Sequence, residues 1–156
     1  MTFRGLHELS LDPKNRVNVP AAFRPALAEG IVLRPNVENC VEIWPESKAE
    51  EREAEEMAGL NPYSRESRRM QRRIFSMSTN GKLDSAGRVL LNKQLIDFAG
   101  LEGKCVLIGA GSHLEIWDPE EWDSESTENE TQAAEMNESL AAKHDAARGA
   151  VPGGGA

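Results

Sequence analysis

The feature that most constrains the fold of this chain is an internal repeat. Residues 11–17 read LDPKNRV and residues 83–89 read LDSAGRV, so that Leu, Asp, Arg and Val recur around a variable centre. Each copy closes on nearly the same word, VEIWP at residues 41–45 and LEIWDP at residues 114–119. Self-similarity at a fixed spacing indicates duplicated architecture. Two copies of about 45 residues are too few for a solenoid and each is too small to be stable alone, so we expect them to pack on each other or to interlock.

The repeat divides the chain into four predicted segments. They are a first repeat at residues 5–47, a helical connector at residues 48–75, a second repeat at residues 76–122 and an acidic, partly disordered C-terminal tail at residues 123–156. Within the tail, the part from Thr131 to Ala147 has the composition of a helix, and the final GAVPGGGA is typical of disorder.

Helices are predicted in the connector and after each Arg-Val word. The segment 46–58 is rich in helix-favouring residues and stops before Gly59, and Ser64 with Ser67 is placed to cap a further helix. In the first copy Pro20 suits the first helical position, whereas in the second copy Asn92 suits an N-cap.

The centre of each Leu-Asp-x-x-x-Arg-Val motif has the composition of a β-hairpin tip. Asp12 and Asp84 occupy the first position, where an Asp side chain accepts backbone N–H bonds. Asn15 and Gly87 fall at the same place, and they are the residue types that best tolerate a positive φ. We therefore predict one shared turn shape, with a strand that begins at the following Arg.

The Asp–Arg pair of each turn has two interpretations. It either buttresses the turn, as an exposed ion pair worth about 0–1 kcal/mol, or it orients the arginine toward a ligand. Arginine suits bidentate recognition of guanine or phosphate, and a projecting β-ribbon fits the major groove of DNA. We predict that Arg16 and Arg88 contact DNA, supported by Asp12 and Asp84.

Other basic residues are weaker candidates for DNA contact. Lys14 and Lys82 lie near the turns and serve either as phosphate contacts or as solvated lysines. Arg4 has no counterpart in the second copy. The arginine-rich segment 65–73 is either a phosphate clamp or a basic helix face that pairs with the acidic segment 50–56.

The net charge of −8 argues against a nucleic-acid partner when the chain is taken as a whole, but five of these charges lie in residues 123–156. Binding depends on local potential, so the charge does not exclude DNA. No apolar run is long enough for a membrane helix or resembles a signal peptide, and we expect a cytoplasmic protein without a membrane partner.

The sequence contains no pattern typical of catalysis or metal binding. Cys40 and Cys105 are expected to be reduced and partly buried, and no Cys or His pair has the spacing of metal ligands. No activated nucleophile or phosphate-binding loop is apparent. We therefore expect no enzyme activity, cofactor, metal or small-molecule substrate.

The words LDPKNRVNVP, LDSAGRVLL and LEIWDPEEW, in this order, resemble the MraZ family over residues 3–122. The resemblance implies a β-rich α+β fold in which two AbrB/SpoVT-like repeats form a pseudo-symmetric swapped-hairpin β-barrel with flanking helices. One departure is Asn92, where the family pattern often has proline.

The resemblance also implies a function. Members are bacterial, nucleoid-associated DNA-binding transcriptional regulators that assemble into ring-shaped homo-oligomers. They act, as a repressor would, on direct repeats of double-stranded DNA in the promoter of their own division and cell-wall gene cluster. Two alternatives stay open, an oligomeric protein-interaction scaffold and an AbrB-like transition-state regulator or antitoxin.

Overall fold

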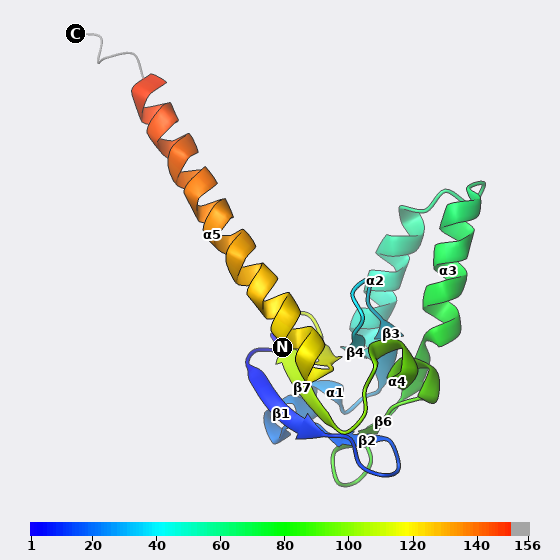
Figure 1. Cartoon of the computed structure of the whole chain (residues 1–156). Coiled ribbons are helices and arrows are strands. Elements are labelled where there is room, and N and C mark those ends of the chain that lie inside the picture. Colours follow the sequence, from blue (N-terminus) through cyan, green and yellow to red (C-terminus); the bar gives the residue numbers. More distant parts are fainter. Residues whose placement is uncertain (151–156) are drawn as a thin grey trace. The chain divides into compact units, whose positions relative to one another are not determined.

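The computed structural model describes the backbone of residues 1–150 and the side chains of residues 1–147 (Figure 1). The predicted disordered end, GAVPGGGA, lies outside the described residues except for its first two positions. The chain divides into two units, Met1–Pro119 and Glu120–Ala156, and both repeat motifs belong to the first.

The structure is α+β with a mostly antiparallel sheet, which confirms the predicted fold class. The elements of the first unit are, in order, β1 (Leu6–Ser10), β2 (Arg16–Asn18), the 3-10 helix η1 (Ala21–Phe23), α1 (Arg24–Leu27), β3 (Ile31–Pro35), β4 (Val41–Pro45), α2 (Glu46–Ala58), α3 (Arg65–Met77), β5 (Thr79–Gly81), β6 (Arg88–Leu90), α4 (Lys93–Ala99), β7 (Lys104–Gly109) and β8 (Leu114–Trp117). The long helix α5 (Pro119–Ala150) follows.

The sheet order shows that the two repeats interlock. The six-stranded sheet runs β1-β7-β8-β4-β3-β5, and a separate ribbon pairs β2 with β6. When each strand is exchanged for its counterpart in the other repeat, the order reads the same from the opposite edge. The first strand of each repeat, β1 or β5, pairs with the third strand of the other, β7 or β3.

The strand register places an approximate two-fold axis between the repeats. In the β2–β6 ribbon, Val17 lies opposite Val89. Where β4 meets β8 in the large sheet, Glu42 lies opposite Glu115. Each pair consists of equivalent residues of the two copies, so both centres of pairing lie on the same axis of pseudo-symmetry.

This pairing corrects the prediction of a hairpin at each repeated motif. The chain reverses direction at both motifs, but β1 and β2 pair with β7 and β6 instead of with each other. Alternation of polar and apolar residues specifies which face of a strand is buried, and it carries no information about the partner strand. Among the described strands, β1 and β5 remain the two edges of the six-stranded sheet, so the sheet does not close into a barrel.

The apolar core lies on one face of the sheet and is built from both repeats. Val17 and Val89 point into it from the ribbon, and Ile43 and Ile116 enter it from the two EIW words. Because side chains alternate along a strand, the tryptophans of those words lie on the opposite face of the sheet, where Trp44 packs on α2 instead of in the main core.

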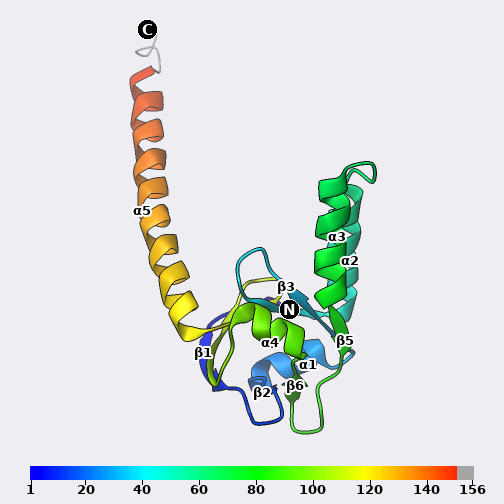
Figure 2. The ribbon, with the colours of Figure 1, turned by 45° about the vertical axis from the view of Figure 1, so that its right-hand side comes forward.

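The helices of the connector form much as predicted. The bounds of α2, Glu46–Ala58, agree with the predicted segment, and Ala49 is its buried residue. Ser64 caps α3 by accepting a hydrogen bond from the backbone N–H of Ser67 at 3.3 Å. Figures 1 and 2 show α2 and α3 running alongside each other away from the sheet.

The helix starts within the repeats differ in detail from expectation. Pro20 is the N-cap of η1 and not its first residue. Asn92 is the N-cap of α4, but its side chain donates to the carbonyl of Met77 at 3.3 Å and does not cap the helix. Gly100, at φ 65°, ends α4 in the left-handed conformation that favours glycine.

Helix α5 is longer than the predicted tail helix, because it begins at Pro119 and continues to Ala150. Within the part of the chain that the structure describes, no helix is long and apolar enough to cross a membrane.

Candidate nucleic-acid interface

The first repeated turn is organised around one carboxylate. Asp12 Oδ1 accepts the backbone N–H groups of Lys14 at 2.8 Å and of Arg16 at 2.9 Å. Its Oδ2 accepts the side-chain Nε of Arg16 at 2.8 Å. The backbone of Asp12 also donates to the carbonyl of Arg16 at 2.9 Å, so the ends of the turn are closed on each other.

The second turn repeats this arrangement with different residues at its centre. Asp84 Oδ1 accepts the backbone N–H groups of Ala86 at 3.0 Å and of Arg88 at 2.9 Å, and Oδ2 accepts Arg88 Nε at 2.8 Å. Because both guanidinium groups are held through Nε, their terminal nitrogens are presented beyond the carboxylate. About a quarter to a third of each arginine side chain is exposed, 26% for Arg16 and 32% for Arg88.

Both aspartates are held in the ionised form. Loss of water contacts alone would raise the pKa of Asp12, but hydrogen bonds from Arg16 and Lys14 together with the charge of Arg16 leave this pKa below its usual range. The pKa of Asp84 is lowered chiefly by the backbone hydrogen bond from Arg88, with further contributions from the Arg88 side chain and Ala86.

The left-handed residue of each turn joins it to the other repeat. Asn15 has φ 62° and Gly87 has φ 78°, as the turn prediction requires. The carbonyl of Asn15 accepts the N–H of Leu91 at 2.8 Å, and the carbonyl of Gly87 accepts the N–H of Val19 at 3.0 Å. Each turn is therefore braced by the chain that follows the ribbon strand of the opposite copy.

The ribbon brings the two arginines onto one face. Arg16 lies opposite Leu90, and Arg88 lies opposite Asn18, while the intervening valines point into the core. Since side chains alternate along a strand, these four project from the outer face. We call this face, with the turns at residues 12–16 and 84–88, the paired-turn surface; Figures 1 and 2 show both turns side by side beyond β2 and β6.

Arg24 is a basic residue of this region that the sequence analysis did not identify. Its Nε donates to the carbonyl of Val19 at 2.9 Å, and its guanidinium lies so close to Gly87 that a Cβ there would overlap it. Its position directly after the 3-10 helix η1 carries no recognisable motif, and only the interlocking of the repeats places it beside the second turn.

The remaining predicted cations are distributed unevenly. Lys14 is exposed within the first turn, and Lys82 is exposed two residues before Asp84. Arg4 is exposed at the start of the chain, between Phe3, which bridges to Gly111, and the beginning of β1. It therefore lies at the end of β1 remote from the first turn, and the structure does not bring it to the paired-turn surface.

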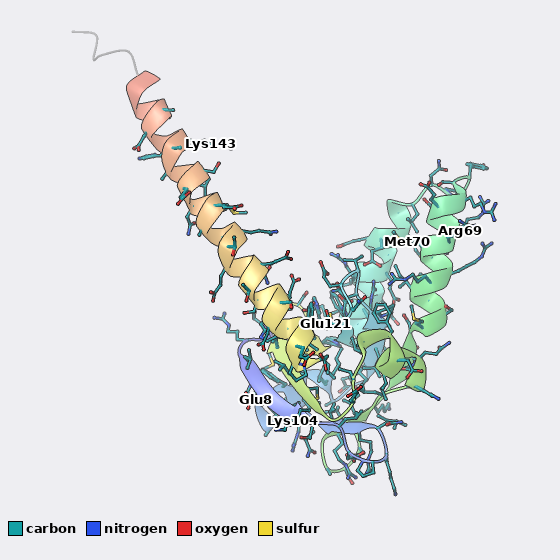
Figure 3. The ribbon with its side chains drawn as sticks, viewed as in Figure 1. Glu8, Arg69, Met70, Lys104, Glu121 and Lys143 are labelled. Atoms are coloured by element: carbon teal, nitrogen blue, oxygen red, sulfur yellow. The ribbon has the colours of Figure 1, made fainter. Side chains whose placement is uncertain are left out.

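The arginines of α3 form a separate basic surface. Among the described residues, none of them pairs with an acid of α2; the acids of α2 instead contact Arg34, whose guanidinium lies 2.7 Å from Glu56 and 3.7 Å from Glu53. Arg73 lies over the ring of Phe98 at 5.2 Å. Arg69 is exposed on the same helix (Figure 3).

Both cysteines are buried, more completely than predicted, and neither forms a disulfide bond. Burial raises the pKa of the Cys105 thiol to about 11. A thiol in this state is largely protonated at neutral pH and is a poor nucleophile.

Comparison with known proteins agrees with the duplication. Residues 2–73 and 74–145 each match the family model described as "MraZ protein, putative antitoxin-like". A protein named Transcriptional regulator MraZ from Roseiflexus castenholzii is 36% identical over 141 residues, covering 90% of this chain and 94% of the relative. A relative of the same name from Saccharopolyspora erythraea is 35% identical, and the match covers 88% of this chain and 96% of the relative. Another, from Methylobacillus flagellatus, is 38% identical, and the match covers 77% of this chain and 83% of the relative. The chain belongs to the MraZ family.

Proposed function

We propose that this protein is a sequence-specific DNA-binding transcription regulator that contacts double-stranded DNA through the paired-turn surface. The names of its relatives support regulation of transcription. The observation that carries the proposal is the placement of Arg16 and Arg88 on one face, each anchored by an aspartate through Nε.

The anchored geometry suits recognition because the aspartate uses only the inner edge of each guanidinium. The terminal nitrogens stay available for a phosphate or for the O6 and N7 atoms of guanine. Ordering each arginine before binding also reduces the side-chain entropy lost on contact. The aspartates themselves support the arginines and do not contact the anionic DNA.

The other basic residues differ in how close they lie to the turns, and the proposal gives them different roles accordingly. Lys14, Lys82 and Arg24 lie at or near the turns, where they would contact phosphates and contribute to affinity without selecting a sequence. A contact from Arg4 requires the DNA path, or a second subunit, to reach the other end of β1.

The finer expectations from the family resemblance are part of the proposal. The interlocked strand pairing supports the inference that this chain adopts a form of the swapped-hairpin arrangement. We propose that several chains form a ring-shaped homo-oligomer, bind direct repeats in the promoter of their own division and cell-wall gene cluster, and repress it at the nucleoid. Several weak turns acting together would give an acidic chain sufficient affinity through effective concentration.

Fluorescence anisotropy with DNA from upstream of the protein's own gene tests the proposal. Arg16→Ala and Arg88→Ala are each expected to weaken specific binding by about 1–3 kcal/mol per lost bidentate contact, and the double variant is expected to abolish it. Arg69→Ala removes the same charge from α3 and is the matched control. Specific binding should also decline steeply with salt, because several phosphates release counterions.

The control also distinguishes the competing surfaces. If the double variant binds like the wild type while its oligomer is intact by light scattering, the Asp–Arg pairs are only turn buttresses. If Arg69→Ala alone weakens binding, the basic face of α3 is the interface. Arg4→Ala shows whether the contact extends along β1.

The second candidate function is an oligomeric protein-interaction scaffold, which the acidic character of the chain, −8 overall, favours. The scaffold is supported if the purified chain retains no DNA at low salt and captures a basic protein through the same turns. The antitoxin-like family description favours a further candidate, an AbrB-like transition-state regulator or antitoxin, which also binds DNA.

A further inference from the structure

The sheet contains a convergent group of buried polar side chains on its approximate two-fold axis, remote in sequence from the turns. Glu42 and Glu115 face each other across the β4–β8 pair. The indole N–H of Trp44 donates to Glu42 Oε1 at 2.9 Å, and that of Trp117 donates to Glu115 Oε1 at 3.1 Å. Each carboxylate thus has one oxygen fixed by the tryptophan of its own EIW word, and the Oε2 atoms converge.

His113 completes this group from the loop before β8. Its Nε2 lies 3.0 Å from Glu115 Oε2 and 3.5 Å from Glu42 Oε2. Its Nδ1 lies 2.9 Å from Ser112 Oγ. The ring stacks on Trp44 at 4.5 Å between centroids with an interplanar angle of 11°, so its orientation is set on three sides.

Asn36 contacts the same two oxygens. Its Nδ2 donates to Glu42 Oε2 at 2.7 Å and to Glu115 Oε2 at 3.2 Å. Its Oδ1 accepts the backbone N–H of Glu38 at 2.9 Å, which fixes the orientation of the amide. Asn36 therefore holds the two carboxylates in place and turns its amide Nδ2, not its Oδ1, toward them.

The charges of the group are not balanced by protein cations. The carboxylate side chains are only 9% and 13% exposed for Glu42 and Glu115. Arg34 Nε lies 3.1 Å from Glu42 Oε1, but the same guanidinium also contacts Glu53 and Glu56. One positive charge is thus shared by three acids, and Glu115 has no arginine or lysine partner among the described residues. Buried carboxylates that converge in this way favour a cation between them.

We propose that Glu42, His113 and Glu115 form a binding site for one divalent transition-metal ion. Their ligand atoms all lie within 4.8 Å of one another, so small side-chain adjustments would bring all three to bonding distances of about 2.0–2.2 Å. The ion takes the place of the proton on Nε2, while Ser112 accepts from Nδ1–H and holds the tautomer that metal ligation requires.

The donor set indicates the class of ion. One imidazole nitrogen with two carboxylate oxygens suits Zn²⁺ or Mn²⁺ better than the all-oxygen preferences of Ca²⁺ and Mg²⁺. Because Glu42 belongs to the first repeat while His113 and Glu115 belong to the second, a bound ion would join the two repeats across β4 and β8. The site is independent of the proposed DNA contact.

The first test is an equilibrium titration of the full chain after removal of metals with a chelator. With Zn²⁺ and Mn²⁺, we expect saturable binding of one ion per chain. The fluorescence of Trp44, which stacks on the His113 ring, should change as the ion binds. Mg²⁺ and Ca²⁺ should bind much more weakly. His113→Gln and Glu115→Gln are each expected to weaken metal binding more than about 100-fold. This is a larger loss than is usual when a residue that only hydrogen-bonds to a metal ligand is changed. Glu50→Gln, which changes an exposed acid of α2, is the matched control and should bind like the wild type.

Nitrogen NMR of the wild-type histidines provides a test that needs no variant to fold. Binding of Zn²⁺ should shift Nε2 of His113 and leave His7 and His144 unchanged. The proposal is wrong if no ion binds, if the His113 signal is unchanged at saturation, or if folded His113→Gln and Glu115→Gln bind as the control does. The last result would assign the binding to surface acids.

Discussion

At the scale of single residues, each repeated turn depends on an aspartate that acts on both backbone and side chain. One oxygen of Asp12 accepts two backbone N–H groups, and the other orients the arginine. The same contacts recur around Asp84 although none of the three central residues is shared. The four-residue spacing from Asp to Arg, which both turns share, therefore determines the shape of the turn as well as the direction of its arginine.

The left-handed residue and the Asp–Arg pair of each turn could be predicted from the sequence, because both depend only on neighbouring residues. Arg24 and His113 could not be assigned in this way. Arg24 acquires its place beside Gly87, and His113 its place beside Glu42, only through contacts between copies that are far apart along the chain.

Substitution of the left-handed residues separates backbone strain from packing. Asn15→Ala is expected to destabilise the fold by about 1 kcal/mol, since alanine tolerates positive φ poorly. Gly87→Ala is expected to cost more, because the new Cβ also displaces Arg24 from the Val19 carbonyl. Urea unfolding measures both.

The control for this comparison is a double-mutant cycle. In an Arg24→Ala background, the extra cost of Gly87→Ala should fall to that of Asn15→Ala. An unchanged cost in that background would show that Arg24 does not restrain the turn.

The lowered pKa values of Asp12 and Asp84 predict a dependence of stability on pH. A carboxyl whose pKa is lower in the folded than in the unfolded state stabilises the fold fully above its unfolded pKa, and this contribution is lost as the pH falls through the folded pKa. The stability difference between wild type and an Asp12→Asn, Asp84→Asn double variant should therefore be constant above about pH 5 and shrink below about pH 4. Urea midpoints over a pH series measure it; a constant difference down to pH 2 would contradict the expectation.

At the scale of elements, local signals predicted helices better than strands. The bounds of α2 and the Ser64 cap of α3 follow from composition and capping residues. The start of a strand at the arginine of each motif was also predicted from the turn, and β2 and β6 begin at Arg16 and Arg88. The partners of β1 and β2 were not predicted, because strand pairing is decided by contacts over long sequence separations, which a local pattern does not encode.

Helix α3 should be sensitive to its cap because it has no buried residue of its own. Ser64→Ala is expected to cost about 1 kcal/mol and to increase amide hydrogen exchange in the first turn of α3. Ser67→Ala is the matched control, since Ser67 contributes its backbone N–H and not its side chain. Equal exchange in both variants would show that the helix is held by other contacts.

At the scale of the whole molecule, every pairing of β1, β2, β5 and β6 is made with a strand of the other repeat. Neither repeat can complete its sheet without the other. We therefore expect fragments 1–62 and 63–156, divided in the loop where Tyr63 is 91% exposed, to be unfolded separately and to form a native-like complex when co-expressed.

Circular dichroism and light scattering of the separate and combined fragments measure this expectation. A cut in the same loop of the intact protein should leave the two pieces associated. Cooperative unfolding of either fragment by itself would contradict the interpretation that the repeats are structurally interdependent.

The covalent connection between the interlocked repeats also affects how the molecule can evolve. In a dimer of identical chains, every substitution in one turn appears in both, and the pair must recognise a symmetric target. Here the connector joins two genetically independent turns, and they already differ, with Lys14 and Asn15 in one and Ala86 and Gly87 in the other. Under the proposed function, one half can therefore change its specificity while the other preserves the fold, and a protein with approximate two-fold symmetry is free to recognise a target that has none.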